Sequence, residues 1–103
     1  MQQVESDGQV TTVDTIYFNF QNTLFMYQIY SPKSDSFRSE YGFNNMPDNN
    51  SIVIELTDNP VPVASFLPFT DWTEATRHYS VEKVDRKQLI LKADNKKYTF
   101  RKF

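Results

Sequence analysis

The chain has 103 residues and a net charge of −2, which is enough length for one hydrophobic core, and we expect residues 1–103 to form a single domain. Nine Phe and six Tyr against two Gly argue against disorder, and two glycines exclude P-loops, nucleophile elbows and dinucleotide fingerprints. The absence of cysteine excludes disulfides and thiolate chemistry, and the weakly acidic balance argues against nucleic acid as a partner.

Alternation of apolar and polar residues with a period of two predicts strands along most of the chain. In chain order, the expected strands are 1–6, 10–20, 23–31, 36–44, 51–57, 76–84, 88–93 and 97–103. Short polar connections such as Gln21-Asn22 and Asp94-Asn95-Lys96 are typical of hairpin turns. About seven to nine short strands joined in this way predict an all-β fold, a small antiparallel up-and-down β-barrel.

The same alternation predicts which side chains face the interior. In the fourth expected strand, Phe37, Tyr41 and Phe43 share one face and should point inward. Arg38 and Glu40 share the opposite face and should lie in solvent.

Two further strands alternate clearly enough to place single residues. Ile54 and Phe100 lie at the centres of their strands, so both should be almost fully buried. Other aromatic residues expected on inward faces are Phe25, Tyr27 and Tyr98. The strand at 23–31 is apolar on both faces, which implies that its outer side is also covered, by residues 60–72 or by a partner.

Residues 59–72 interrupt the rhythm of strands. Pro60, Pro62 and Pro68 exclude a central strand, because proline cannot donate to the ladder. We expect an extended edge or crossover, with one helical turn that begins at Thr70 as its N-cap. The segment is too apolar to hang in water, so it should close one end of the barrel or cover the outer face of 23–31, with Trp72 mostly buried.

Few side chains support catalysis. His78 is the only histidine, and nothing in its sequence surroundings suggests a triad or a zinc site. Glu40 and Glu55 lie in adjacent expected strands, but both fall opposite the apolar stripe and should be solvated rather than form a catalytic pair. We therefore expect no enzyme, no catalytic residue, no metal and no cofactor. No run of about 18 apolar residues exists, so we also expect no transmembrane segment.

Small closed barrels use their interior either as a packed core or to hold one apolar ligand. The candidate ligand-binding residues are Phe25, Tyr27, Phe37, Tyr41, Phe66, Phe69 and Trp72. The alternative is a protein-interaction module or inhibitor with a solid core, which docks through the 60–72 segment or a sheet edge. The expected partner is therefore a small hydrophobic ligand or another protein.

Four segments of the chain resemble the small lipocalin-like lipoproteins of Bacteroidetes, a group without an assigned activity. These segments are Asp14-Thr-Ile-Tyr-Phe, Leu24-Phe-Met-Tyr-Gln-Ile-Tyr, Ser65-Phe-Leu-Pro-Phe-Thr-Asp-Trp72 and Tyr98-Thr-Phe-Arg-Lys-Phe103. The resemblance implies an up-and-down barrel, a lipid anchor on a cysteine that this sequence lacks, and a location in the periplasm or at the cell surface. The first-strand Gly-x-Trp of true lipocalins is absent, so Arg101 cannot be assigned the role of the arginine that stacks on that tryptophan.

Overall fold

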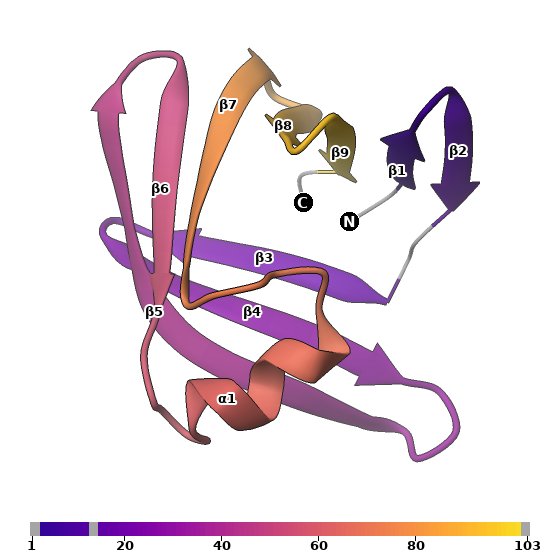
Figure 1. Ribbon diagram of the computed structural model, residues 1–103, viewed down its shortest axis with the longest axis vertical. Coiled ribbons are helices and arrows are strands. Elements are labelled where there is room, and N and C mark those ends of the chain that lie inside the picture. The colour runs from indigo at the N-terminus through magenta and orange to yellow at the C-terminus, as the bar shows by residue number, and fades with distance from the viewer. Residues whose placement is uncertain (1–2, 13–14, 102–103) are drawn as a thin grey trace.

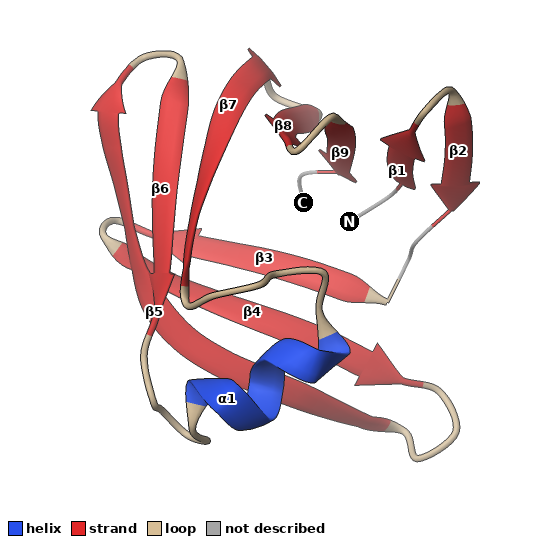
Figure 2. Cartoon of the chain, in the orientation of Figure 1, coloured by secondary structure: helices blue, strands red, loops and turns tan. Residues whose placement is uncertain are grey.

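The computed structural model describes residues 3–12 and 15–101, and these form one antiparallel sheet with a short helical segment (Figures 1 and 2). The strands are β1 (Gln3–Ser6), β2 (Gln9–Thr12), β3 (Ile16–Gln21), β4 (Leu24–Ser31), β5 (Ser36–Asp48), β6 (Ser51–Leu56), β7 (Thr76–Val84), β8 (Gln88–Ala93) and β9 (Lys96–Arg101). The helical elements are α1 (Val63–Phe66) and η1 (Leu67–Phe69), the second a 3-10 turn.

The strand order is β2-β1-β9-β8-β7-β6-β5-β4-β3. Strands β3 to β9 therefore follow each other as a meander, and the chain start adds β1 and β2 beyond β9. No ladder joins the edge strands β2 and β3 among the described residues, so the sheet is curled but not closed by hydrogen bonds there. The all-β, up-and-down prediction is confirmed. The strand expected at 10–20 is instead divided into β2 and β3, and predictions for residues 1–2, 13–14 and 102–103 lie outside the described residues.

Aromatic rings fill the space that the curled sheet encloses. The ring of Phe18 on β3 lies 4.6 Å from that of Phe100 on β9 and 4.8 Å from that of Tyr27, so opposite parts of the sheet meet in the middle. The buried rings come from Phe25, Tyr27, Phe66, Trp72, Tyr79, Tyr98 and Phe100. Ile54 is 0% and Phe100 5% exposed, which confirms both predictions. Within the described part of the chain, these rings thus form a packed aromatic core.

The prediction for the faces of β5 is wrong. Phe37, Tyr41 and Phe43 are 55%, 46% and 51% exposed, whereas Glu40 is fully buried. The register pairs Glu40 with Tyr27, whose ring belongs to the core, so the even-numbered positions of β5 face inward.

The register with β4 accounts for this reversal, because Glu40 and Gly42 pair with the core residues Tyr27 and Phe25. Strand β5 also approaches β6 closely at Gly42. A Cβ atom at this position would lie 2.2 Å from the carbonyl oxygen of Glu55, so only glycine fits. The alternation of apolar and polar residues in 36–44 is as regular as in a core strand. The inward-facing position 42, however, is a glycine and contributes no side chain to the core. The regular pattern therefore does not identify the buried face.

The segment 60–72 packs on the inner side of the sheet. The Phe66 ring of α1 lies 5.3 Å from that of Tyr27, and Trp72 is 4% exposed, so the prediction of a buried Trp72 is confirmed. Figures 1 and 2 show α1 beside β4 and β5, at one end of the curled sheet. The alternative that the segment covers the outer face of 23–31 is wrong, because Leu24 on that face stays exposed.

The expected helical turn beginning at Thr70 is also wrong, because the helical segment ends there. The Thr70 hydroxyl donates to the Leu67 carbonyl oxygen at 2.9 Å and accepts from the Trp72 backbone N–H at 3.0 Å. Pro68 lies in the first turn of η1, where a missing N–H costs nothing. The prolines thus exclude a strand, as expected. They permit helical structure over residues 63–69, before the predicted start at Thr70.

We predict that Phe100→Ala lowers the free energy of unfolding by about 3–5 kcal/mol, because the truncated ring leaves a cavity in the core. The matched control is Phe43→Ala on the outer face of β5, which should cost less than about 1 kcal/mol. Urea unfolding of both variants measures the difference. Equal losses of unfolding free energy in the two variants would contradict the placement of Phe100 in the core and of Phe43 on the outer face.

Candidate functional site

A cleft of about 860 Å³ opens where the β4–β5 hairpin passes residues 60–69. Its walls include Ile29, Lys33, Phe37, Arg38, Val61 and Phe69. These residues come from two segments that are distant in the sequence, the hairpin and the helical segment after β6. The volume lies within the range of about 300–1,000 Å³ that is usual for small-molecule sites.

Arg38 lies on the inner side of β5, close to the opening of the cleft. Its guanidinium carbon is 3.7 Å from the centre of the Phe69 ring, which is the geometry of a cation–π contact. The guanidinium makes no ion pair with any residue of 3–12 or 15–101. Its flat face is therefore occupied by Phe69, while its N–H edges are left for another acceptor.

Glu40, two residues along the same face of β5, has an unusual environment for a carboxyl group. The Val61 backbone N–H donates to its Oε1 at 3.2 Å, and its Oε2 is buried without a hydrogen-bond partner. Burial raises the pKa of the Glu40 carboxyl above its ordinary value, and the nearby charge of Asp58 acts in the same direction, while the bond from Val61 opposes them. The expectation that Glu40 is solvated is therefore wrong.

Glu40 and Glu55 do not form a carboxylate pair. Glu55 pairs with Phe43 on the exposed outer face, while Glu40 points into the interior. His78 is exposed on β7. No cluster of three or more potential metal-ligating side chains occurs among the residues that the structure describes. Within this same part of the chain, no helix has the length and apolar character needed to cross a membrane.

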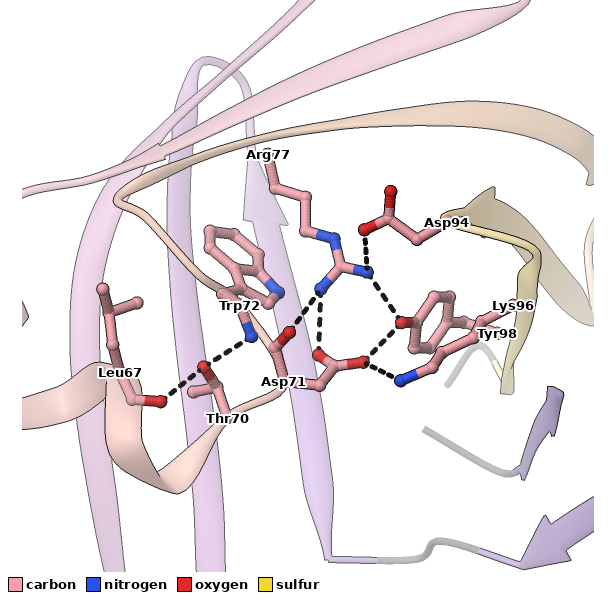
Figure 3. Close-up of polar contacts among 8 residues, drawn as sticks. All are labelled: Leu67, Thr70, Asp71, Trp72, Arg77, Asp94, Lys96 and Tyr98. Carbon is pink, nitrogen blue, oxygen red and sulfur yellow. Dashed lines mark hydrogen bonds and ion pairs between the residues drawn. The ribbon is translucent and has the colours of Figure 1, made fainter.

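A second polar cluster connects Asp71, in the crossover before β7, to β7 and β9 (Figure 3). Arg77 Nη1 lies 3.0 Å from Asp71 Oδ1, and Arg77 Nη2 donates to the Tyr98 hydroxyl oxygen at 2.9 Å. The Tyr98 hydroxyl donates to Asp71 Oδ2, and Lys96 Nζ lies 3.7 Å from the same carboxylate oxygen. Burial and the bond to Asp71 both raise the pKa of Tyr98, so the phenol keeps its proton. The Arg77 Nη atoms, the Tyr98 hydroxyl and the Asp71 carboxylate bond to one another, which indicates a structural role, while Arg77 Nε is buried without a hydrogen-bond partner.

The structure separates the seven candidate ligand-binding residues. Phe37 and Phe69 line the cleft, whereas Tyr27, Phe66 and Trp72 belong to the closed core. Phe25 and Tyr41 border a smaller recess of about 340 Å³ beside β3.

Sequence reasoning missed Ile29, Arg38 and Val61 as cleft residues. Arg38 was assigned to solvent together with Glu40; Arg38 is indeed exposed, but its face of β5 is the inner one, where it borders the cleft. The alternation of 36–44 contains no signal for this, because Arg38, Glu40 and Gly42 all occupy its non-aromatic positions.

We predict that Glu40→Gln stabilises the protein at neutral pH relative to acidic pH. Because the folded-state pKa of Glu40 is raised, the unfolded chain releases this proton first, so the free energy of unfolding falls as pH rises through the raised value. Glutamine cannot ionise, so the free energy of unfolding of the variant should not decrease with pH for this reason. The free energy of unfolding of the variant, relative to that of the native protein, should therefore grow from about pH 4 upward. Glu55→Gln, which removes an exposed carboxylate, is the control for charge removal. A constant difference across pH would contradict the burial of an ionisable group at Glu40.

Comparison with known proteins gives a consistent picture. A family model described as lipocalin-like domain matches residues 1–103, and no curated protein matches the chain. The crystal structure of an uncharacterised protein from Bacteroides eggerthii is similar, with 28% identity and a TM-score of 0.84, over 99% of this chain and 93% of that one. The crystal structure of a lipocalin-like protein from Bacteroides uniformis has the same fold, with 24% identity and a TM-score of 0.82 over 99% of this chain and 92% of that one. Because the family match spans the whole chain, the protein belongs to the family of lipocalin-like domains.

Proposed function

We propose that this lipocalin-like domain is a non-enzymatic binding protein that holds a small ligand with an apolar body in the cleft between the β4–β5 hairpin and residues 60–69. The observation that carries the proposal is the cleft itself, about 860 Å³ with Ile29, Val61 and Phe69 in its walls. Concave sites of this size with mostly apolar walls are the usual form of small-molecule sites.

The packed interior supports a site at the opening rather than in the centre of the sheet. Phe18 and Phe100 meet there at 4.6 Å, and the surrounding rings are buried. At the cleft, by contrast, Phe69 is 52% exposed although its ring is apolar. A ligand that covers this ring gains the free energy of removing it from water.

The absence of enzymatic activity is part of the same proposal. It is supported by the separation of Glu40 from Glu55 on opposite faces and by the exposed position of His78, away from the cleft.

A second candidate function is docking of a protein partner on the outer face of β4 and β5. Leu24, Tyr41 and Phe43 are exposed and adjacent there, since the register pairs Leu24 with Phe43 and places Tyr41 beside Met26. Contiguous exposed apolar side chains are typical of interaction surfaces. This surface differs from the 60–72 segment, whose largest rings are mainly buried.

A location in the periplasm or at the cell surface, with a lipid anchor, is also proposed, on the strength of the resemblance to Bacteroidetes lipoproteins alone. Protease added to intact cells that produce the full protein should cleave it if it is at the surface, and only after the outer membrane is opened if it is periplasmic. Protection until the cytoplasm is released would contradict an envelope location.

We predict that Phe69→Ser weakens binding of an uncharged apolar probe, N-phenyl-1-naphthylamine, by about tenfold or more, because one aromatic contact is removed. Fluorescence titration measures the dissociation constant. Phe43→Ser is the matched control, since Phe43 is as exposed as Phe69 but lies on the outer face. Loss of binding in Phe43→Ser with none in Phe69→Ser would place the site on the outer face, and no binding to the native protein would contradict the proposal.

A further inference from the structure

The guanidinium of Arg38 is arranged as a receptor for an anion. Arg38 is exposed, and stacking on Phe69 orients the plane of its guanidinium, whose N–H donors lie along the edges in a fork that matches a carboxylate. It lines the cleft, and none of the described residues forms an ion pair with it. Because the guanidinium stacks on a ring and has no counter-ion within the described chain, it is oriented to donate hydrogen bonds to an anion from outside the chain.

The charged side chains in the walls of the cleft have one sign. Two cationic residues, Arg38 and Lys33, belong to its walls, and none of the described lining residues is acidic. Asp35 lies in the same hairpin turn, but it is not in the walls and accepts a hydrogen bond of 2.7 Å from the Tyr30 hydroxyl. The buried carboxyl of Glu40 is turned toward the Val61 N–H, and burial favours its neutral form. The cleft is therefore complementary to negative charge.

The remaining walls are apolar and lie beside this charge. Ile29 pairs with Arg38 across β4 and β5, and Val61 and Phe69 approach from the other side of the cleft. One end of a bound molecule thus meets Arg38, while its body meets aliphatic and aromatic surface. A molecule with a single anionic head and an apolar tail satisfies both parts.

We propose that the ligands of the cleft are amphipathic monocarboxylates, whose carboxylate pairs with the free edge of the Arg38 guanidinium while the apolar tail lies against Ile29, Val61 and Phe69. This inference rests on the proposed function and names its ligand class. Lys33, on the turn, adds a second positive charge at the entrance. Because the cleft is open to solvent, the preference for an anion should decrease as ionic strength rises.

The experiment compares three ligands with the same tail, namely dodecanoate, dodecanol and dodecylammonium, as competitors of N-phenyl-1-naphthylamine. On the native protein, dodecanoate should displace the probe at a concentration about tenfold or more below that of dodecanol, as expected for hydrogen bonds to charged groups, and dodecylammonium should be the weakest. Arg38→Gln should reduce the affinity for dodecanoate to that for dodecanol and leave the affinity for dodecanol unchanged. Arg38→Lys should keep part of the preference, since it keeps the charge but not the fork.

The matched control is Arg86→Gln, the same change of charge at an exposed position in the β7–β8 turn, which should keep the full preference. Equal displacement by dodecanoate and dodecanol on the native protein would overturn the inference while leaving the proposed function intact. If Arg38→Gln weakens both ligands alike, Arg38 acts only by holding Phe69 in place, and recognition of the carboxylate is overturned. Failure of every ligand to displace the probe would contradict the proposed function itself.

Discussion

The contact between Phe18 and Phe100 determines much of the rest of the structure. These rings come from strands far apart in the order of the sheet, and their centroids lie only 4.6 Å apart. To bring them together the sheet must curl strongly, and the space inside is then occupied by further rings in tilted and edge-on arrangements, which aromatic pairs prefer. These rings fill the middle of the sheet, and exposed apolar side chains are found at the cleft, such as Phe69, and on the outer face of β4 and β5, such as Leu24 and Phe43.

Strand β5 connects this core to the rim. Its inner positions change in character along the strand, from Arg38 at the cleft through buried Glu40 to Gly42 against β6. The glycine permits close strand packing near the core, the carboxyl holds the backbone of Val61, and the guanidinium stacks on Phe69. Two polar side chains of β5 thus hold the segment 60–69: Glu40 binds its backbone at Val61, and Arg38 stacks on its Phe69 ring.

Periodicity predicted the strands well, because each strand carries its own pattern and needs no knowledge of its neighbours. The burial of Ile54 and Phe100 followed in the same way. The buried face of β5 could not be predicted in this way, because Phe37, Tyr41 and Phe43 alternate as regularly as buried residues do. It follows from the pairing of Glu40 and Gly42 with core residues of β4, which the pattern of β5 alone does not contain.

The candidate site was harder still to predict. Phe37 was named because it was expected to point inward, and Phe69 because it lies in the apolar segment 60–72. Arg38 and Val61 acquire a role only where two segments distant in the sequence meet. The cluster of Asp71, Arg77 and Tyr98 is equally non-local, since its members come from the crossover, β7 and β9.

The two ends of the segment 60–72 are held with very different strength. Its end at Asp71 and Trp72 is fixed by the ion pair to Arg77, the bond from Tyr98 and a buried indole ring. Its beginning depends on single bonds, from the Val61 N–H to Glu40 and from the Val63 N–H to Asp58 at 2.8 Å. Local opening starts where contacts are fewest. Because the Phe66 ring is buried in the middle of the segment, opening should be confined to residues 60–63, so the cleft would widen at Val61 while the aromatic core stays intact.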